Sequence, residues 1–188
     1  MDKVQGKRRP VDPMRHHREN GWDYKGRAIY HFTLPVEERF PLFGTLEGER
    51  AETAFVRLNP FGRRVCQMLC GLAQFYAGKG FALKVLAQKV MPDHVHLCVG
   101  LHPTIAVASF VHDLKIATGN FMRSRRDLFP MFERWESSYG AFTYAEADKE
   151  RVVGYIKNQK EHHKRVNTHD EMVAILKEFG IEYDERYI

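Results

Sequence analysis

The chain has 188 residues and a mass of 22.0 kDa, with 44% hydrophobic residues and a formal net charge of +5. That length and composition predict one domain with a sizeable core. No apolar run approaches the roughly 20 residues of a membrane span, and the first residues lack the apolar stretch of a signal peptide. Three cysteines without a Cys-x-x-Cys pair are typical of reduced thiols. We therefore expect a soluble cytoplasmic protein.

Basic charge is concentrated in two stretches of the chain. Residues 1–27 hold eight Lys/Arg against four Asp/Glu, and residues 115–165 hold eleven against seven. Residues 166–188 are acidic, with two against six. The pattern suits a polyanion such as nucleic acid, although an ordinary solvated surface explains the charge equally well. We expect residues 1–27 to form a poorly ordered basic arm and residues 28–188 to form the domain.

The first half of the domain predicts strands around one helix. An alternating run near Ala28–Leu34 indicates a strand, with Phe55–Leu58 as a candidate partner. An amphipathic helix follows from Pro60, with Asn59 as its N-cap, and ends by the glycines at 78 and 80. The runs at 81–91 and 94–99, with Pro-Asp between them, indicate a hairpin.

The second half predicts a helix over 104–126, a strand within 132–142 and a helix over 146–165. Thr168 and Glu171 have the spacing of a capping box, which would start a short C-terminal helix ending before Gly180. The element order is that of a split βαβ, or ferredoxin-like, α+β fold. Such a fold has an antiparallel sheet with helices on one face and leaves the other face for a site.

His94 and His96 interrupt the apolar run "VMPDHVHLCVG". Residues two apart on a strand project from one face, with Cα atoms roughly 6.6 Å apart, so both imidazoles can reach one metal ion. The spacing alone fits a structural or incidental pair equally well. Cys98 shares that face, which leaves a zinc site open as an alternative, although three ligands along one straight strand chelate poorly.

Tyr155 and Gln159 offer a second way to complete the site. They are four residues apart and share one face of a predicted helix. A metal could polarise a phosphodiester while the phenol attacks phosphorus. Nitrogen and oxygen ligands without thiolate favour Mg²⁺ or Mn²⁺. His162 and His163, on the same helix, could touch DNA or the metal, but a solvated helix end is the more ordinary interpretation.

The segments "MPDHVHLCVG", "YGAFTYAEADKERVVGYIKNQKEHHKR" and "DEMVAILKEFGIEYDERYI" together resemble the single-tyrosine HUH transposases, namely the insertion sequence 200-like and REP-associated tyrosine transposases. The resemblance covers roughly residues 28–188. It implies that His94, His96 and Gln159 hold Mg²⁺ or Mn²⁺ and that Tyr155 is the nucleophile. Asp93 stands where the family's asparagine is expected, a change that we expect to affect the turn more than the metal.

The resemblance also implies a function. The enzyme would cleave and rejoin single-stranded DNA at hairpin-bearing ends through a 5′-phosphotyrosine intermediate, as a homodimer in the bacterial cytoplasm and nucleoid. The alternative is a domesticated single-stranded DNA or RNA-binding protein without cleavage activity. The DNA hairpin, the cleavage sequence and the placement of Tyr155 within a dimer stay open. Candidate nucleic-acid-binding residues are Lys115, Arg123, Arg125, Arg126, Lys157, Lys160, Lys164 and Arg165.

Overall fold

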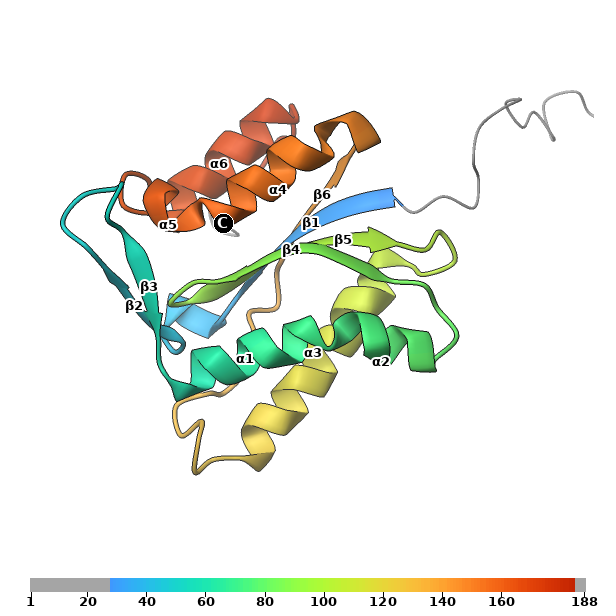
Figure 1. Ribbon diagram of the computed structural model, residues 1–188, viewed down its shortest axis with the longest axis horizontal. Coiled ribbons are helices and arrows are strands. Elements are labelled where there is room, and N and C mark those ends of the chain that lie inside the picture. Colours follow the sequence, from blue (N-terminus) through green and yellow to red (C-terminus); the bar gives the residue numbers. More distant parts are fainter. Residues whose placement is uncertain (1–27, 185–188) are drawn as a thin grey trace, which may run out of the picture.

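The computed structural model describes residues 28–184, which form a four-stranded sheet between two groups of helices (Figure 1). The strands are β1 (Ala28–Pro35), β4 (Lys84–Val90), β5 (His94–Leu101) and β6 (Gly140–Tyr144). Their order is β4-β5-β1-β6, and every neighbouring pair is antiparallel. β5 therefore lies between β1 and β4, and a crossover connection that contains helices joins β1 to β4. This is the split βαβ arrangement, so the predicted ferredoxin-like α+β fold is confirmed.

Helices lie on both sides of the sheet (Figure 1). One side carries α1 (Pro60–Cys70), α2 (Leu72–Gly78) and α3 (Val107–Ser124), as the predicted fold requires. The other side, expected to be open, is covered by α4 (Lys149–Lys157), α5 (Gln159–His162) and α6 (Thr168–Glu178). The C-terminal part of the chain therefore encloses the face on which the histidines lie.

The strand Phe55–Leu58 forms, but the prediction that it pairs with the first strand is wrong. It is β3, and it pairs antiparallel with β2 (Gly44–Glu47) in a separate two-stranded sheet. β1 instead finds its partners at β5 and β6, which are distant in sequence. The alternating pattern of a strand indicates which face is buried, but it does not specify the partner.

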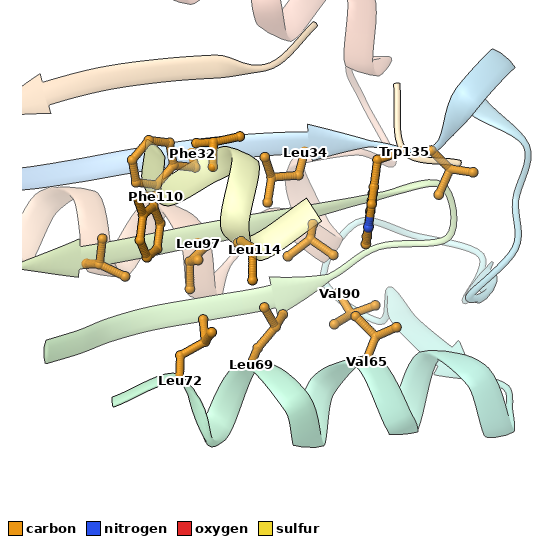
Figure 2. Close-up of a cluster of buried hydrophobic side chains, with 14 of the residues drawn as sticks. Phe32, Leu34, Val65, Leu69, Leu72, Val90, Leu97, Phe110, Leu114 and Trp135 are labelled. Carbon is orange, nitrogen blue, oxygen red and sulfur yellow. The ribbon is translucent and has the colours of Figure 1, made fainter. Parts of the chain in front are cut away.

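The main core lies between the sheet and α1–α3. Alternate residues of β5, Val95, Leu97, Val99 and Leu101, point to this side and are almost fully buried. Figure 2 shows Val65, Leu69 and Leu72 of α1 and α2 directed at the strands, with Phe110 and Leu114 of α3 beside Phe32 and Leu97. Apolar burial of this kind is the main favourable contribution to folding, and it holds β5 rigidly in place.

Local signals explain where the helices begin. Asn59 caps α1 as predicted, because its side chain accepts a hydrogen bond from the Gly62 amide at 2.9 Å. The predicted capping box of α6 is wrong: Asn167 is the N-cap, and its side chain accepts from the Asp170 amide at 2.8 Å. The helix predicted over 146–165 is interrupted at Asn158, which separates α4 from α5. The side chain of Glu171 is therefore free of a capping role.

Between residues 28 and 184, no helix combines the length and the apolar composition that crossing a bilayer would need.

Candidate active site

The histidine face of the sheet carries His31 and Thr33 from β1 and His94 and His96 from β5. Thr33 lies directly opposite His96 in the register of the two strands, so their side chains share a face. The relative exposure of His31, His94 and His96 is 0–1%, which is unusual for imidazoles. A buried polar group is costly unless it finds partners, so their contacts determine what this face can do.

The three imidazoles form a chain of close contacts. His94 Nδ1 lies 2.6 Å from Asp93 Oδ1, His94 Nε2 lies 2.9 Å from His96 Nε2, and His96 Nδ1 lies 3.0 Å from His31 Nε2. Because the Asp93 carboxylate accepts a hydrogen bond, the neutral His94 ring keeps its proton on Nδ1 and directs a lone pair from Nε2. His96 Nε2, on the neighbouring ring, lies next to this His94 Nε2 atom.

Burial keeps these rings neutral. It lowers the pKa of His31 to about 4, against the partly compensating charge of Glu171. Burial likewise lowers the pKa of His94, and that of His96 falls well below its ordinary value. Neutral imidazole is the form that binds metal, so the face is prepared to ligate at neutral pH.

Glu171 of α6 brings the remaining polar side chains of the site together. Its Oε1 accepts hydrogen bonds from the Tyr155 hydroxyl and from Gln159 Nε2, the latter at 2.8 Å. Its Oε2 lies 3.1 Å from His163 Nε2 and 3.9 Å from His96 Nε2. One carboxylate therefore connects the helices α4, α5 and α6 to the histidine face.

Electrostatics hold this carboxylate charged and the phenol neutral. Burial would raise the pKa of Glu171, but the contacts with His163, His96 and Tyr155 outweigh it and hold the pKa far below the usual range. Burial, and then the negative charge of Glu171, raise the pKa of Tyr155 well above that of a free phenol. The resting tyrosine is thus a protonated hydrogen-bond donor.

The donor atoms fit a metal ion. One ligand atom from each of His94, His96, His163 and Glu171 lies within 4.8 Å of the others, and we call these residues the donor group. Gln159 is fully buried, and its Oε1 finds no hydrogen-bond partner among residues 28–184. An unpartnered carbonyl oxygen on a side chain that contacts the Glu171 carboxylate is suited to a divalent cation.

Comparisons with known proteins give the family. A family model described as "Transposase IS200 like" matches residues 26–159, well over half of the chain. The chain belongs to this family. The matched segment contains His94, His96, Tyr155 and Gln159, whereas His163 and Glu171 lie beyond its end.

Two proteins of Deinococcus radiodurans are similar to this IS200-like transposase chain. The curated relative, ISDra2 transposase TnpA, is 32% identical over 84 residues, which span 41% of the chain and 58% of that relative. A crystal structure described as that of a transposase is 23% identical and aligns with a TM-score of 0.48, covering 77% of the chain and 98% of the solved one.

The four residues that the resemblance placed at the site are brought together by the fold, although Tyr155 and Gln159 stand on either side of the break at Asn158. The open zinc alternative finds no support at Cys98. This thiol is packed in an apolar cluster with Ile29, Ala87, Val152 and Ile156, and burial raises its pKa to about 11. A thiolate ligand is therefore disfavoured there.

The candidate DNA-binding cations separate into two groups. Lys157, Lys160, Lys164 and Arg165 lie on or just after α4 and α5, on the side of the histidine face. Lys115 belongs to α3, and its ammonium donates to the Glu136, Ser137 and Ser138 carbonyls. The remaining three lie at the end of α3 and contact nearby side chains, namely Arg123, Arg125 and Arg126. Their part in DNA binding stays a prediction.

Sequence reasoning missed three residues of this site. His31 lies in a plain alternating strand, where nothing distinguishes it from a surface histidine. Glu171 fitted the sequence pattern of a capping box, and no local pattern around it indicated a catalytic role. His163 was expected at a solvated helix end, yet its side chain is only 7% exposed. The Asp93 side chain also does more than shape a turn, because it contacts His94 directly.

Proposed function

We propose that the chain is a transposase that cleaves and rejoins single-stranded DNA at hairpin-bearing ends through a 5′-phosphotyrosine intermediate. Tyr155 is the nucleophile in this proposal, and His94, His96 and Gln159 hold Mg²⁺ or Mn²⁺. The observation that carries it is the convergence on Glu171: the Tyr155 hydroxyl and the Gln159 amide bind one oxygen, and the other oxygen faces His96. Membership of the IS200-like transposase family supports the same conclusion.

The residues allow a balanced cleavage step. The Tyr155 oxygen attacks phosphorus as its proton passes to the Glu171 carboxylate, to which the hydroxyl is already hydrogen-bonded. The bond from phosphorus to the 3′ oxygen breaks, and that oxygen leaves as a 3′-hydroxyl after taking up the proton that Glu171 received from the phenol. A bound divalent ion would supply polarisation of the phosphate and stabilise the charge on its oxygens.

Rejoining is the reverse reaction with a second 3′-hydroxyl. That hydroxyl attacks the phosphotyrosine and passes its proton to Glu171, the Tyr155 oxygen leaves, and Glu171 gives the proton to the phenol. The covalent linkage keeps the energy of the broken phosphodiester, so strand transfer needs no nucleotide hydrolysis. A homodimer and the DNA contacts of Lys157, Lys160, Lys164 and Arg165 belong to the same proposal.

A small cavity offers a route to the phenol. It has a volume of about 160 Å³ and is lined by Tyr155, Glu171, His162, Tyr144 and Arg151, among others. The side chain of Arg151 is 58% exposed and lies 3.3 Å from Asp148 and 3.7 Å from Glu178, so its charge is paired in the absence of DNA.

Intact mass spectrometry tests the proposal. The full chain is incubated with Mn²⁺ or Mg²⁺ and single-stranded hairpin oligonucleotides from the DNA that flanks its gene. We expect a metal-dependent covalent adduct that maps to Tyr155 and is reduced at least about 1,000-fold in Tyr155→Phe, because phenylalanine has no nucleophile. The exposed Tyr139→Phe is the matched control and should retain the adduct.

Two results would overturn the proposal. An adduct that persists in Tyr155→Phe would assign the chemistry to another residue. Tight binding of the same oligonucleotides without any adduct would instead favour a nucleic-acid-binding protein that does not cleave.

A further inference from the structure

We propose that His163 and Glu171, which lie outside the family-matched segment, are themselves metal ligands and make the site selective for a transition metal over Mg²⁺. The complete ligand set would then include His94, His96, His163 and Glu171 in addition to Gln159. The inference rests on the proposed metal centre, but it concerns two residues that the family match over residues 26–159 does not cover.

Geometry is the first argument. His163 Nε2 and Glu171 Oε2 are 3.1 Å apart, and Glu171 Oε2 is 3.9 Å from His96 Nε2. The His163 ring centre lies 4.9 Å from that of His94 and 6.0 Å from that of His96. Ligands of one ion, each at about 2.0–2.2 Å from it, lie roughly 3–4 Å from one another. The contacts of Glu171 Oε2 already have this spacing.

An unpartnered polar atom is the second argument. His163 Nε2 is buried against Glu171 Oε2 at 3.1 Å. Gln159 Oε1, by contrast, is buried and has no hydrogen-bond partner within the described part of the chain. A buried polar atom left unpaired costs roughly 1–3 kcal/mol. A cation that this oxygen helps to ligate would remove that cost.

Charge balance is the third argument. Glu171 is 3% exposed, so its carboxylate is a buried anionic group. A buried carboxylate without a full counter-charge is costly, and coordination to a divalent ion removes that cost. Glu171 also reaches Tyr155, so the same carboxylate would link the ion to the nucleophile.

The donor chemistry sets the metal preference. Mg²⁺ binds oxygen ligands and keeps several waters, whereas imidazole nitrogens suit Mn²⁺ less than Co²⁺ or Zn²⁺ but far better than Mg²⁺. Three imidazoles with a carboxylate therefore favour a transition metal. Since His163 and Glu171 come from the α5–α6 region, the ion would also fasten this region to β5.

Metal titration of the chelator-treated full chain tests the inference. Mn²⁺ and Mg²⁺ affinities are measured by calorimetry, and the visible absorption of bound Co²⁺ reports the ligand set. We expect Mn²⁺ to bind at least 10-fold more tightly than Mg²⁺. His163→Ala and Glu171→Gln should each weaken Mn²⁺ binding at least 10-fold and change the absorption spectrum of bound Co²⁺. His163→Ala should also reduce the ratio of Mn²⁺ affinity to Mg²⁺ affinity.

Matched controls come from α6, the helix that carries Glu171. His169→Ala and Glu178→Gln alter exposed side chains of α6 and should bind both ions as the wild type does. Glu171→Gln keeps the shape of the side chain, so it serves as the deciding variant if His163→Ala fails to fold by circular dichroism. A wild-type Co²⁺ spectrum and Mn²⁺ affinity in Glu171→Gln and in folded His163→Ala would overturn the inference.

His94→Ala separates this inference from the proposed function. If His94→Ala loses Mn²⁺ binding while the His163 and Glu171 variants keep it, the ligand assignment fails and the proposed metal centre stands. If His94→Ala also binds Mn²⁺ as the wild type does, the metal centre itself is wrong, and this inference fails with it.

Discussion

The two faces of β5 carry different kinds of side chain. Val95, Leu97 and Val99 project from one face into an apolar core, whereas the neighbouring His94 and His96 project from the other face into a polar site. Both sides are buried. On the apolar side, every contact with α1–α3 contributes to stability. On the histidine face, the buried groups depend on a few directed partners, so a single substitution there alters chemistry more than it alters packing.

The comparison shows how one strand serves two purposes. The apolar side positions β5 firmly, and this rigidity keeps the two Nε2 atoms of His94 and His96 within 2.9 Å of each other. The histidine face then needs only the C-terminal helices to add Tyr155, Gln159 and Glu171. The packed sheet is thus the scaffold on which the polar site is built.

The largest stability effect is expected on the apolar side. Leu97→Ala should lower the free energy of unfolding by about 2–5 kcal/mol, because a fully buried leucine leaves a cavity. Urea unfolding measures this loss, and Mn²⁺ affinity should stay within about twofold. Met131→Ala, at a 61% exposed side chain, is the control and should change stability by less than about 0.5 kcal/mol. A Leu97→Ala protein that keeps its stability but loses metal binding would contradict the division between the faces.

The next effect belongs to the histidine face. Asp93→Ala removes the partner of His94 Nδ1 at 2.6 Å and should weaken Mn²⁺ binding about 10–100-fold, since the ring loses its orientation. Asp93→Asn should lose less, because its amide oxygen can still accept from the ring. Asp113→Ala on α3 is the control, and calorimetry is the measurement. If Asp93→Ala and Asp93→Asn bind Mn²⁺ as tightly as the Asp113→Ala control does, Asp93 serves only the turn.

The most gradual effect is a pH dependence that only the histidine face can produce. His31 has a pKa of about 4 in the folded chain and an ordinary value of 6.5, so the unfolded chain binds more protons between these limits. The free energy of unfolding should therefore fall as the pH falls from about 6.5 to 4, by up to about 1.4 kcal/mol per pH unit for each such histidine.

Urea unfolding in the presence of a chelator, at pH 7, 6 and 5, measures this slope. Leu97→Ala should lower the whole profile without changing its slope, because the core around Leu97 holds no group that titrates between pH 5 and 7. His31→Asn should flatten the profile. A wild-type stability that is constant from pH 7 to 5 would contradict the neutral state of the buried imidazoles.

Local patterns predicted much of this protein. The alternation of β1 and β5, the Asn59 cap and the spacing of His94 and His96 all depend on residues that are close in sequence, and the structure agrees with each of them. The resemblance to the HUH transposases added Tyr155 and Gln159. Family membership is confirmed by the match over residues 26–159, whereas the roles of these residues stay proposals.

Tertiary structure decided the rest. The partner of Phe55–Leu58, the covering of the histidine face by α4–α6, and the places of His31, His163 and Glu171 depend on contacts between distant segments. Glu171 shows the reason most clearly. Its sequence neighbours indicate a helix cap, but Asn167 caps α6, and burial against Tyr155, Gln159 and His96 gives the carboxylate its environment. A periodic sequence specifies which way a side chain points, whereas only the packed chain determines what it meets.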